Sequence, residues 1–600
     1  MRRAWRIFFL GGCGYLLGVC ARGIGQQTQP SDDAKQIAAN PAGKMLVIVH
    51  DARLIEATRA WTDYRESPEG GGWMVRLVGV GKVGENAEQS ETNNEIQKRI
   101  REAFKGVKAG NGAEGGSAVL ILGDVPDGDA ARVDASGGGV PTWKFEQKDH
   151  LLWATLHGQA VRDYITDEPY QYLDDKDDVP DVALGRVPAR NNEEAMQALA
   201  KIKAFEQGKR SDDACSSSDW RWRINFTAGE GHFGAMDGVM ESLFRQMVAQ
   251  HVPPAYVMQV TYAKSNSVFC PAPDDLEKTV LSHLRNGSLL FNYIGHGSTQ
   301  GFDHLSWQGK NYPILRSNDL GELGSARSPT AVALLCCCST GWFDLPNGER
   351  SLAEELLFAP GGPMAVIAGS RPTHPYANAI VEKDVIRAVV SGIIRTVGQA
   401  DLFAARGMRE SDAEDRAIDA IATPIANSMK WDLSLSEERA MHTRLYNLLG
   451  DPTMLIRPGF GGIDREGDAN LIAQLIPANN HDVAAEVTGS FVSAVSGEVR
   501  VSLESTIAQS ADSPATKPDV NDEDETAFRE AYLSANNHVL WETRGVVGEH
   551  GTFRISVGTI PEEAHAVRVE FCGRDVKGHE LHGMRMILIA SAGRVLHPAQ

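Results

Sequence analysis

The sequence predicts an α/β protein built on a mostly parallel sheet, followed by a smaller all-β unit. Between residues 44 and 459, short apolar runs that end in glycine-containing turns alternate with segments whose apolar residues recur at helical spacing. Such strand–helix alternation is typical of parallel sheets joined by right-handed crossovers. From about residue 470, alternating apolar and polar residues between glycine-rich turns indicate antiparallel strands. A chain of 600 residues is too long for one core, so we expect several units.

The composition excludes one class of partner. The formal net charge is −20 at pH 7. Nucleic-acid binding needs clustered lysine and arginine side chains that neutralise phosphates. We therefore expect no nucleic-acid partner for this acidic chain.

The first residues have the pattern of an export signal. A basic start, MRRAWR, precedes the apolar run IFFLGGCGYLLGV, and VCA ending at Ala21 offers small residues for cleavage. The apolar run is shorter than the ~20 residues of a membrane-spanning helix, which favours a signal peptide over 1–21 rather than a retained anchor. Residues 22–42 are expected to be a flexible leader, and we expect no membrane span in the mature chain. The mature protein is therefore expected in the periplasm, in the cell envelope or outside the cell.

The first α/β unit is expected over 43–207. Its apolar runs predict strands and its amphipathic segments predict helices. The strands are KMLVIVH at 44–50, WMVRLVGV at 73–80, SAVLILGDVP at 117–126 and the start of 182–207; the helices are 52–65, 93–107 and the remainder of 182–207.

An acid-rich segment, DEPYQYLDDKDDVPD, occupies 167–181 within this unit. Its carboxylates offer oxygen ligands for structural calcium, but they lack a fixed ligand spacing. A solvated acidic loop is the alternative. No spacing in the chain indicates a zinc site, and we expect no metal in the chemistry.

The second α/β unit is expected over 208–459. Strands that end in turns are predicted at 221–231, 288–298, 330–341 and 363–371, with helices at 237–251, 275–286, 351–358 and 378–392. The unit closes with RLYNLLGDPTMLIRPG at 444–459. A β-sandwich of immunoglobulin-like size is predicted over 470–597, interrupted by an acidic loop at 509–526.

Two strands of the second unit end in turns that carry reactive side chains. YIGHGS contains His296, and LLCCCSTG contains Cys336, Cys337 and Cys338, which lies 42 residues after the histidine. Neighbouring parallel strands would bring both turns to one edge of the sheet, where an imidazole lowers the pKa of a thiol. In a strand Cys336 and Cys338 share a face and Cys337 points the other way. The alternatives are a histidine that serves only its turn and cysteines that serve as small buried hydrophobes.

Several ordered motifs resemble the gingipain family of cysteine peptidases, whose fold is caspase-like. These are NYIGHGS, CSTGWFD, SLAEELLFAPGGPMAVIAGSR and YNLLGDPTMLI, preceded by VLILGDVP, DVPDVALGRVPA and AGEGHFG in the same order. The resemblance covers about 44–458. It implies a catalytic unit of two mostly parallel α/β subdomains and peptide-bond hydrolysis by a Cys/His dyad acting on protein or peptide substrates.

The resemblance also implies residue roles. His296 matches the general base, and Cys338 matches the nucleophile because it alone precedes two residues, Gly, one residue and Phe. The backbone N–H groups of Gly297 and Cys338 would hold the oxyanion. Glu230 matches an acid near the catalytic histidine; its alternative role is to accept hydrogen bonds within its own turn.

Substrate preference is the least constrained part of the resemblance. Glu241 falls where arginine-specific gingipains carry the acid that receives a basic side chain, and Asp237 one turn away is its alternative. Cleavage after basic residues is therefore one hypothesis. A solvated role for Glu241 and the positive charge of Arg371 stand against it.

Three readings of function follow. The main hypothesis is an exported cysteine endopeptidase, expected to be a monomer. A transpeptidase that attaches proteins to the cell envelope is the first alternative, since the same dyad transfers an acyl group to an amine. A non-catalytic envelope or adhesion protein is the second. Whether Cys215 and Cys270 form a disulfide stays open.

Overall fold

The computed structural model describes most of the chain after residue 43. The described residues are 44–81, 91–106, 116–126, 130, 132–133, 138–146, 163–207, 220–231, 245–248, 250–253, 256–324, 326–429, 431, 433–456, 471–477, 484–491, 495–505, 525–548, 551–561, 564, 566–575, 580–590 and 594–595. The predicted signal peptide and leader lie outside them.

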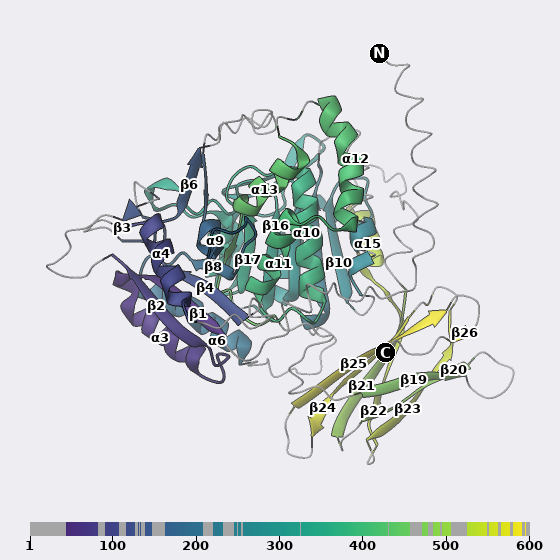
Figure 1. The fold of residues 1–600 in the computed structure, drawn as a ribbon. Coiled ribbons are helices and arrows are strands. Elements are labelled where there is room, and N and C mark those ends of the chain that lie inside the picture. Colours follow the sequence, from purple (N-terminus) through teal and green to yellow (C-terminus); the bar gives the residue numbers. More distant parts are fainter. Residues whose placement is uncertain are drawn as a thin grey trace.

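Ten strands form one sheet (Figure 1). Their order is β10 (Val257–Ala263), β9 (Arg223–Gly229), β11 (Ser288–Ile294), β16 (Thr330–Cys336), β17 (Ala365–Gly369), β18 (Tyr446–Leu449), β8 (Ala183–Val187), β4 (Ser117–Leu122), β1 (Met45–Asp51) and β2 (Met74–Val80). Every neighbouring pair is parallel except β17 and β18. The predicted mostly parallel α/β sheet is therefore confirmed.

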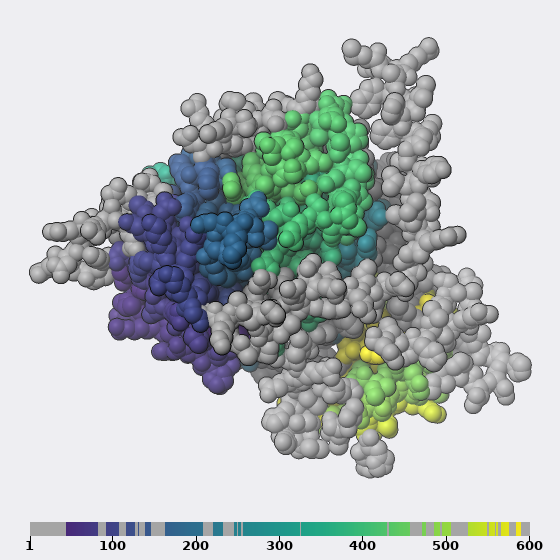
Figure 2. Space-filling model, viewed as in Figure 1, coloured from purple at the N-terminus to yellow at the C-terminus, as the bar shows by residue number. Residues whose placement is uncertain are grey.

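The two predicted α/β units contribute adjoining parts of this sheet. The strands before residue 190 form one end and the later strands form the other, and they meet where Leu449 of β18 pairs with Arg186 of β8. Figure 2 shows the N-terminal segment, in purple and blue, lying directly against the later helices, in green. Strand β10 was not predicted from the sequence.

Helices cover both faces of the sheet. They are α3 (Ile55–Glu66), α4 (Asn93–Phe104), α6 (Asn192–Glu206), α8 (Leu276–Asn286), α9 (Leu352–Phe358), α10 (Pro375–Val390), α11 (Val397–Arg409), α12 (Ala413–Met429) and α13 (Leu435–Leu445). The alternating side chains of β1 pack against α3 on one face and α4 on the other. The helix predicted at 237–251 lies largely outside the described residues, and α11, α12 and α13 were not predicted.

Short two-stranded antiparallel sheets form in the loops between the main strands. They pair β3 (Glu91–Thr92) with β5 (Arg132–Val133), β6 (Trp143–Glu146) with β7 (Asp163–Thr166), β12 (Gly297–Ser298) with β13 (Gly301–Phe302), and β14 (His304–Trp307) with β15 (Lys310–Pro313). The pair β12 and β13 follows the His296 turn directly.

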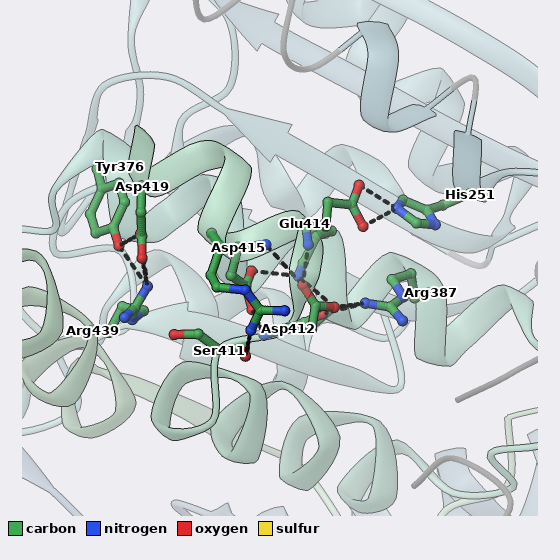
Figure 3. Close-up of polar contacts among 12 residues, drawn as sticks. His251, Tyr376, Arg387, Ser411, Asp412, Glu414, Asp415, Asp419 and Arg439 are labelled. Carbon is green, nitrogen blue, oxygen red and sulfur yellow. Dashed lines mark hydrogen bonds and ion pairs between the residues drawn. The ribbon is translucent and has the colours of Figure 1, made fainter. Parts of the chain in front are cut away.

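A network of ion pairs fixes α12 against α10 and α13 (Figure 3). The Arg387 guanidinium of α10 lies 2.8 Å from the Asp412 carboxylate, and Arg439 of α13 lies 2.8 Å from Asp419 of α12. His251 contacts Glu414 at 2.8 Å. The acidic side of α12 is therefore matched by cations from other segments.

The acid-rich segment 167–181 is also paired with cations. Asp167 lies 2.6 Å from the buried Arg186, and Glu168 lies 2.9 Å from Arg409. Among the described residues no group of three or more histidine, cysteine, aspartate or glutamate side chains is arranged to hold a metal ion. Structural calcium in this segment stays a prediction.

The C-terminal unit consists of two antiparallel sheets. One contains β19 (Leu471–Pro477), β20 (Ala484–Phe491) and β23 (Thr552–Thr559); the other contains β22 (Val539–Val546), β21 (Val495–Glu504), β24 (Ala566–Asp575), β25 (Glu580–Ala590) and β26 (Arg594–Val595). Apolar side chains from both sheets share one core. A helix that was not predicted, α15 (Glu525–Asn536), lies between β21 and β22 in sequence.

The structure shows whether two of the cysteines are bridged and whether a described helix could span a membrane. Cys270 is a buried thiol, so it is not bridged to Cys215, whereas Cys572 on β24 is disulfide-bonded. Within the described ranges, no helix is long and apolar enough to cross a bilayer.

A buried carboxyl beneath the central strands makes stability depend on pH. Glu382 of α10 is 1% exposed and accepts a hydrogen bond from the Asn292 side chain of β11. Burial raises the pKa of Glu382 to about 8, and the Asn292 hydrogen bond offsets this only in part. Because the folded pKa exceeds the unfolded value of ~4.3, this stabilising contribution is complete below pH ~4 and is lost as the pH rises toward 8.

Glu382→Gln is therefore expected to leave stability unchanged at pH 4.5 and to raise it at pH 9. Glutamine keeps the acceptor for Asn292 and removes the titration. The gain at pH 9 should be about 3–5 kcal/mol in the free energy of unfolding, measured by denaturant titration. Glu66→Gln, on the exposed face of α3, is the control and should change stability at neither pH. Equal stability of Glu382→Gln and the unaltered protein at pH 9 would contradict the prediction.

Candidate active site

The histidine and cysteine turns lie at one edge of the sheet. Strand β11 pairs with β16 so that Ile294 lies opposite Cys336, the last residue of β16. His296 and Cys338 each follow this pair by two residues, so both lie just past the carboxyl ends of adjacent parallel strands. The 42-residue separation seen in the sequence is the register offset of these two strands.

The three cysteines have different surroundings. Cys336 and Cys337 are 0% exposed and belong to core clusters on opposite faces of the sheet. Cys338 lies beyond the strand and is partly exposed. Burial raises the pKa of Cys336 and Cys337 strongly, so both thiols stay protonated and apolar in character. The expectation that they form the buried end of the strand is confirmed.

A sharp turn follows Cys338. Ser339 has φ of 59°, in the left-handed region that residues other than glycine rarely adopt. The Gly341 backbone lies so close to β17 that a Cβ there would be 2.9 Å from the Ala368 Cβ. Phe343 is 2% exposed and anchors the turn in the core. The Gly-x-Phe pattern after Cys338 thus has a structural reason.

The two turns touch through their backbones. A Cβ on Gly297 would lie 2.8 Å from the Cys337 Sγ and 2.9 Å from the Cys338 carbonyl oxygen. Only glycine permits this approach without moving one of the turns. The backbone of Gly297 and that of Cys338, which we expect to supply oxyanion donors, are therefore neighbours.

The thiol of Cys338 is held by the segment after β17. The Thr373 backbone N–H donates a hydrogen bond to the Cys338 Sγ at 3.4 Å. Burial raises the pKa of Cys338, and this hydrogen bond lowers it in part. Near neutral pH the thiol is therefore mainly protonated and needs a base to become a nucleophile.

The imidazole of His296 is oriented by a backbone carbonyl. Its Nε2 lies 2.8 Å from the carbonyl oxygen of Gly231, two residues beyond the end of β9. A carbonyl only accepts, so Nε2 carries the proton, and the lone pair of the neutral ring is on Nδ1. The Glu230 side chain makes no hydrogen bond or ion pair in the described part of the chain. The Gly231 carbonyl therefore contacts the ring, and the orienting role of Glu230 stays a prediction.

A buried tyrosine, Tyr293 of β11, holds the backbone of the histidine turn by hydrogen bonds. The Tyr293 hydroxyl donates to the His296 carbonyl oxygen at 2.7 Å and accepts from the Asp303 N–H at 3.3 Å. Its ring stacks on Phe302 at 3.7 Å between centroids. The turn is therefore held at its backbone as well as at its ring.

Of the three residues weighed for substrate preference, the structure describes only Arg371. Asp237 and Glu241 lie outside the described residues. Arg371 is 2% exposed, stacks on Trp342 at 3.9 Å, and lies 2.9 Å from the Asp344 carboxylate. The positive charge of Arg371 is therefore compensated, which weakens the objection it raised to a basic substrate.

A polar hollow is lined by residues from the segment after β12 and from the start of α9. It has a volume of about 480 Å³ and is lined by Gln300, Ser317, Asn318, Gly348, Glu349, Arg350 and Glu355. The start of α9 is bonded to the segments that follow His296 and Cys338. The Leu352 N–H donates to the Thr299 carbonyl oxygen at 2.7 Å, and the Ala353 N–H donates to the Thr340 carbonyl oxygen at 2.9 Å. The only cation in its lining, Arg350, lies 2.7 Å from the carboxylate of Glu194. The hollow therefore presents an excess of negative charge.

Sequence reasoning missed two contacts at this site, the Gly231 carbonyl and the Thr373 N–H. Both are backbone groups, so the identity of their side chains carried no chemical signal. The strands that precede them, at 221–231 and 363–371, were predicted from their apolar patterns, but nothing in the pattern marked these backbone groups.

A thiol and an imidazole at adjoining carboxyl ends of parallel strands define the class of cysteine-dependent hydrolases. The sequence model of peptidase family C25 matches residues 38–457. The chain belongs to this family and is a cysteine-type peptidase. The gingipain resemblance of the sequence is thereby confirmed.

Solved structures give weaker similarities. The Arg-specific cysteine proteinase gingipain R is 14% identical with a TM-score of 0.46, over 92% of this chain and 99% of that chain. The complex of RgpB pro- and mature domains from Porphyromonas gingivalis is 13% identical with a TM-score of 0.44, over 91% and 100%. Dimeric latent PorU from the same organism is 14% identical with a TM-score of 0.30, over 90% and 42%. No curated protein matches the chain.

Proposed function

We propose that the protein is an exported cysteine endopeptidase in which Cys338 is the nucleophile and His296 the general base. The observation that carries the proposal is the shared position of these residues, each two residues beyond a paired position of adjacent strands. The Nδ1 lone pair of His296 takes the thiol proton, and the Thr373 N–H stabilises the thiolate. The Gly231 carbonyl keeps Nε2 protonated throughout.

The thiolate then attacks the scissile carbonyl carbon, and the backbone N–H groups of Gly297 and Cys338 stabilise the oxyanion. His296 donates its Nδ1 proton to the leaving amine, which leaves a thioester on Cys338. Water, deprotonated by His296, hydrolyses the thioester and restores the thiol. No step needs a metal or a cofactor.

A preference for basic substrate residues is part of the proposal. Glu349 and Glu355 in the hollow are carboxylates with no ion pair in the described part of the chain, and they suit a lysine or arginine side chain of the substrate. Glu241 and Asp237 are further candidates for the same preference.

Digestion of a peptide library with mass detection of the products tests this function. We expect cleavage that is enriched after, or near, lysine and arginine. Glu349→Gln with Glu355→Gln should lower kcat/KM for basic peptides about tenfold and leave neutral peptides unchanged. The matched control is Glu56→Gln with Glu66→Gln, on exposed positions of α3, which removes two negative charges elsewhere on the protein. Equal cleavage of basic and neutral peptides would refute the preference.

Two alternatives are decided by the same assay. Products that carry an added amine nucleophile would indicate transpeptidation to the cell envelope rather than hydrolysis. Absence of any cleavage, together with no labelling by a thiol-directed peptide reagent, would indicate a non-catalytic envelope or adhesion protein.

An immunoglobulin-like topology of the C-terminal sheets and export by residues 1–21 remain part of the proposal.

A further inference from the structure

Helix α15 belongs to the C-terminal unit in sequence but packs against the catalytic unit. It immediately precedes β22, and Figure 1 shows it beside β10 rather than among the C-terminal strands. β10 is the edge strand of the ten-stranded sheet, so one row of its backbone groups has no strand partner. The Asn536 side-chain amide satisfies this edge, since its Oδ1 accepts from the Val260 N–H at 2.7 Å and its Nδ2 donates to the Val260 carbonyl at 3.0 Å.

Two aromatic residues of α15 complete the contact. Phe528 is 5% exposed, belongs to the core cluster that contains Tyr293 and Cys337, and packs edge-on against Trp307 at 5.7 Å. The Tyr532 hydroxyl lies 2.9 Å from the Thr261 hydroxyl of β10.

The Tyr532 hydroxyl also contacts His283 of helix α8. It lies 3.3 Å from the His283 Nε2, and the His283 carbonyl accepts from the Asn225 side chain of β9 at 3.3 Å. Burial lowers the pKa of His283 to about 4, so this ring is neutral near neutral pH. The helix therefore contacts β10 directly and β9 through His283.

These strands lead to the candidate catalytic histidine. β10 and β9 are paired along their whole length, from Val257 opposite Arg223 to Ala263 opposite Gly229. Two residues after Gly229, the Gly231 carbonyl holds the His296 Nε2. A shift of β9 by about 1 Å would take this contact beyond hydrogen-bond distance and remove the constraint on the tautomer and direction of the ring.

We propose that Asn536 and Tyr532 of α15 are positioning residues for the peptidase reaction. By holding β10 and β9 in place, they keep the Gly231 carbonyl on His296, so the C-terminal unit contributes to catalysis without touching the substrate. This inference rests on the proposed role of His296 as the base.

The test compares Asn536→Ala, Asn536→Asp and Tyr532→Phe in the full chain. Leu533→Ala on the same helix, at a position 67% exposed, is the matched control. Each protein is assayed at a temperature at which circular dichroism shows it fully folded. We expect Asn536→Ala to lower kcat about tenfold with KM within twofold, and to shift the acidic limb of the kcat/KM–pH profile that reports His296.

The other variants are expected to lower kcat by smaller amounts. Asn536→Asp keeps the acceptor for the Val260 N–H and loses the donor, so it should fall between Asn536→Ala and the unaltered protein. Tyr532→Phe should lower kcat several-fold, and Leu533→Ala should change nothing. If Asn536→Ala and Tyr532→Phe lower only the unfolding temperature and leave kcat and the pH profile unchanged, α15 is a structural brace and the proposal is overturned.

Failure of the proposed function gives a different result. If Cys338→Ala retains activity, the proposed nucleophile is wrong, whereas the comparison of kcat between Asn536→Ala and Leu533→Ala still measures the contribution of α15.

Discussion

Cys338→Ala is expected to lower peptidase activity by roughly 10⁴-fold or more. Alanine removes the thiol of Cys338, which is partly exposed, whereas the thiols of Cys336 and Cys337 are buried. No neighbouring group can replace it, because burial keeps the other two thiols protonated. The measurement is kcat/KM on the peptide that the unaltered protein cleaves best. His296→Ala should reduce it to a similar extent.

Cys337→Ala is the matched control for this experiment. It removes the same atoms one residue away, from a side chain that is 0% exposed in the core. We expect activity within a few-fold of the unaltered protein and a small loss of stability from the vacated space. Full activity in Cys338→Ala, or an equal loss in Cys337→Ala, would show that the nucleophile has been misassigned.

Asp451→Ala is expected to destabilise the protein by about 3–5 kcal/mol. Asp451 is 0% exposed in the turn after β18 and accepts from Trp61 at 2.7 Å and from the Arg65 Nε at 2.8 Å, both on α3. Arg65 is 1% exposed, and the Glu206 carboxylate of α6 also contacts it at 2.8 Å. Removal of Asp451 leaves the buried guanidinium with half of its counter-charge. Denaturant unfolding measures the loss directly.

An exposed ion pair provides the control for Asp451. Asp175 lies 2.8 Å from Arg101, but its side chain is 85% exposed. Asp175→Ala removes the same chemical group and should cost much less stability than Asp451→Ala, because water screens the pair. Similar losses for the two variants would show that the buried network contributes no more than a surface pair.

Much of the sheet could be predicted from the sequence because its strands are buried on both faces. β1, β16 and β17 are continuous apolar runs, and such runs are recognised without knowledge of their neighbours. The turns that follow β11 and β16 carry chemically distinctive residues, so His296 and Cys338 could be named as candidates from the sequence. The alternation of side chains along a strand separated Cys337 from Cys336, and the structure places these two thiols in core clusters on opposite faces of the sheet.

Helices α11 to α13 and α15 could not be predicted in the same way. The acidic side of α12 resembles a solvated segment in sequence, but Arg387, Lys383 and Arg439 from other elements neutralise it. α15 follows the acidic loop predicted at 509–526 and no helix was predicted there, yet its Phe528 is buried in the catalytic core. In both cases the partner lies far away in the chain.

The sequence by itself determined the family and the mostly parallel sheet, and it supplied His296 and Cys338 as the candidate catalytic pair, because these depend on local apolar patterns and on residue chemistry. Only the tertiary structure decided which groups hold the reactive side chains. The Gly231 carbonyl and the Thr373 N–H act through their position, and position arises when strands distant in the chain pair and pack. A backbone group has the same chemistry at every residue, so no sequence pattern distinguishes the one that orients a histidine from the hundreds that do not.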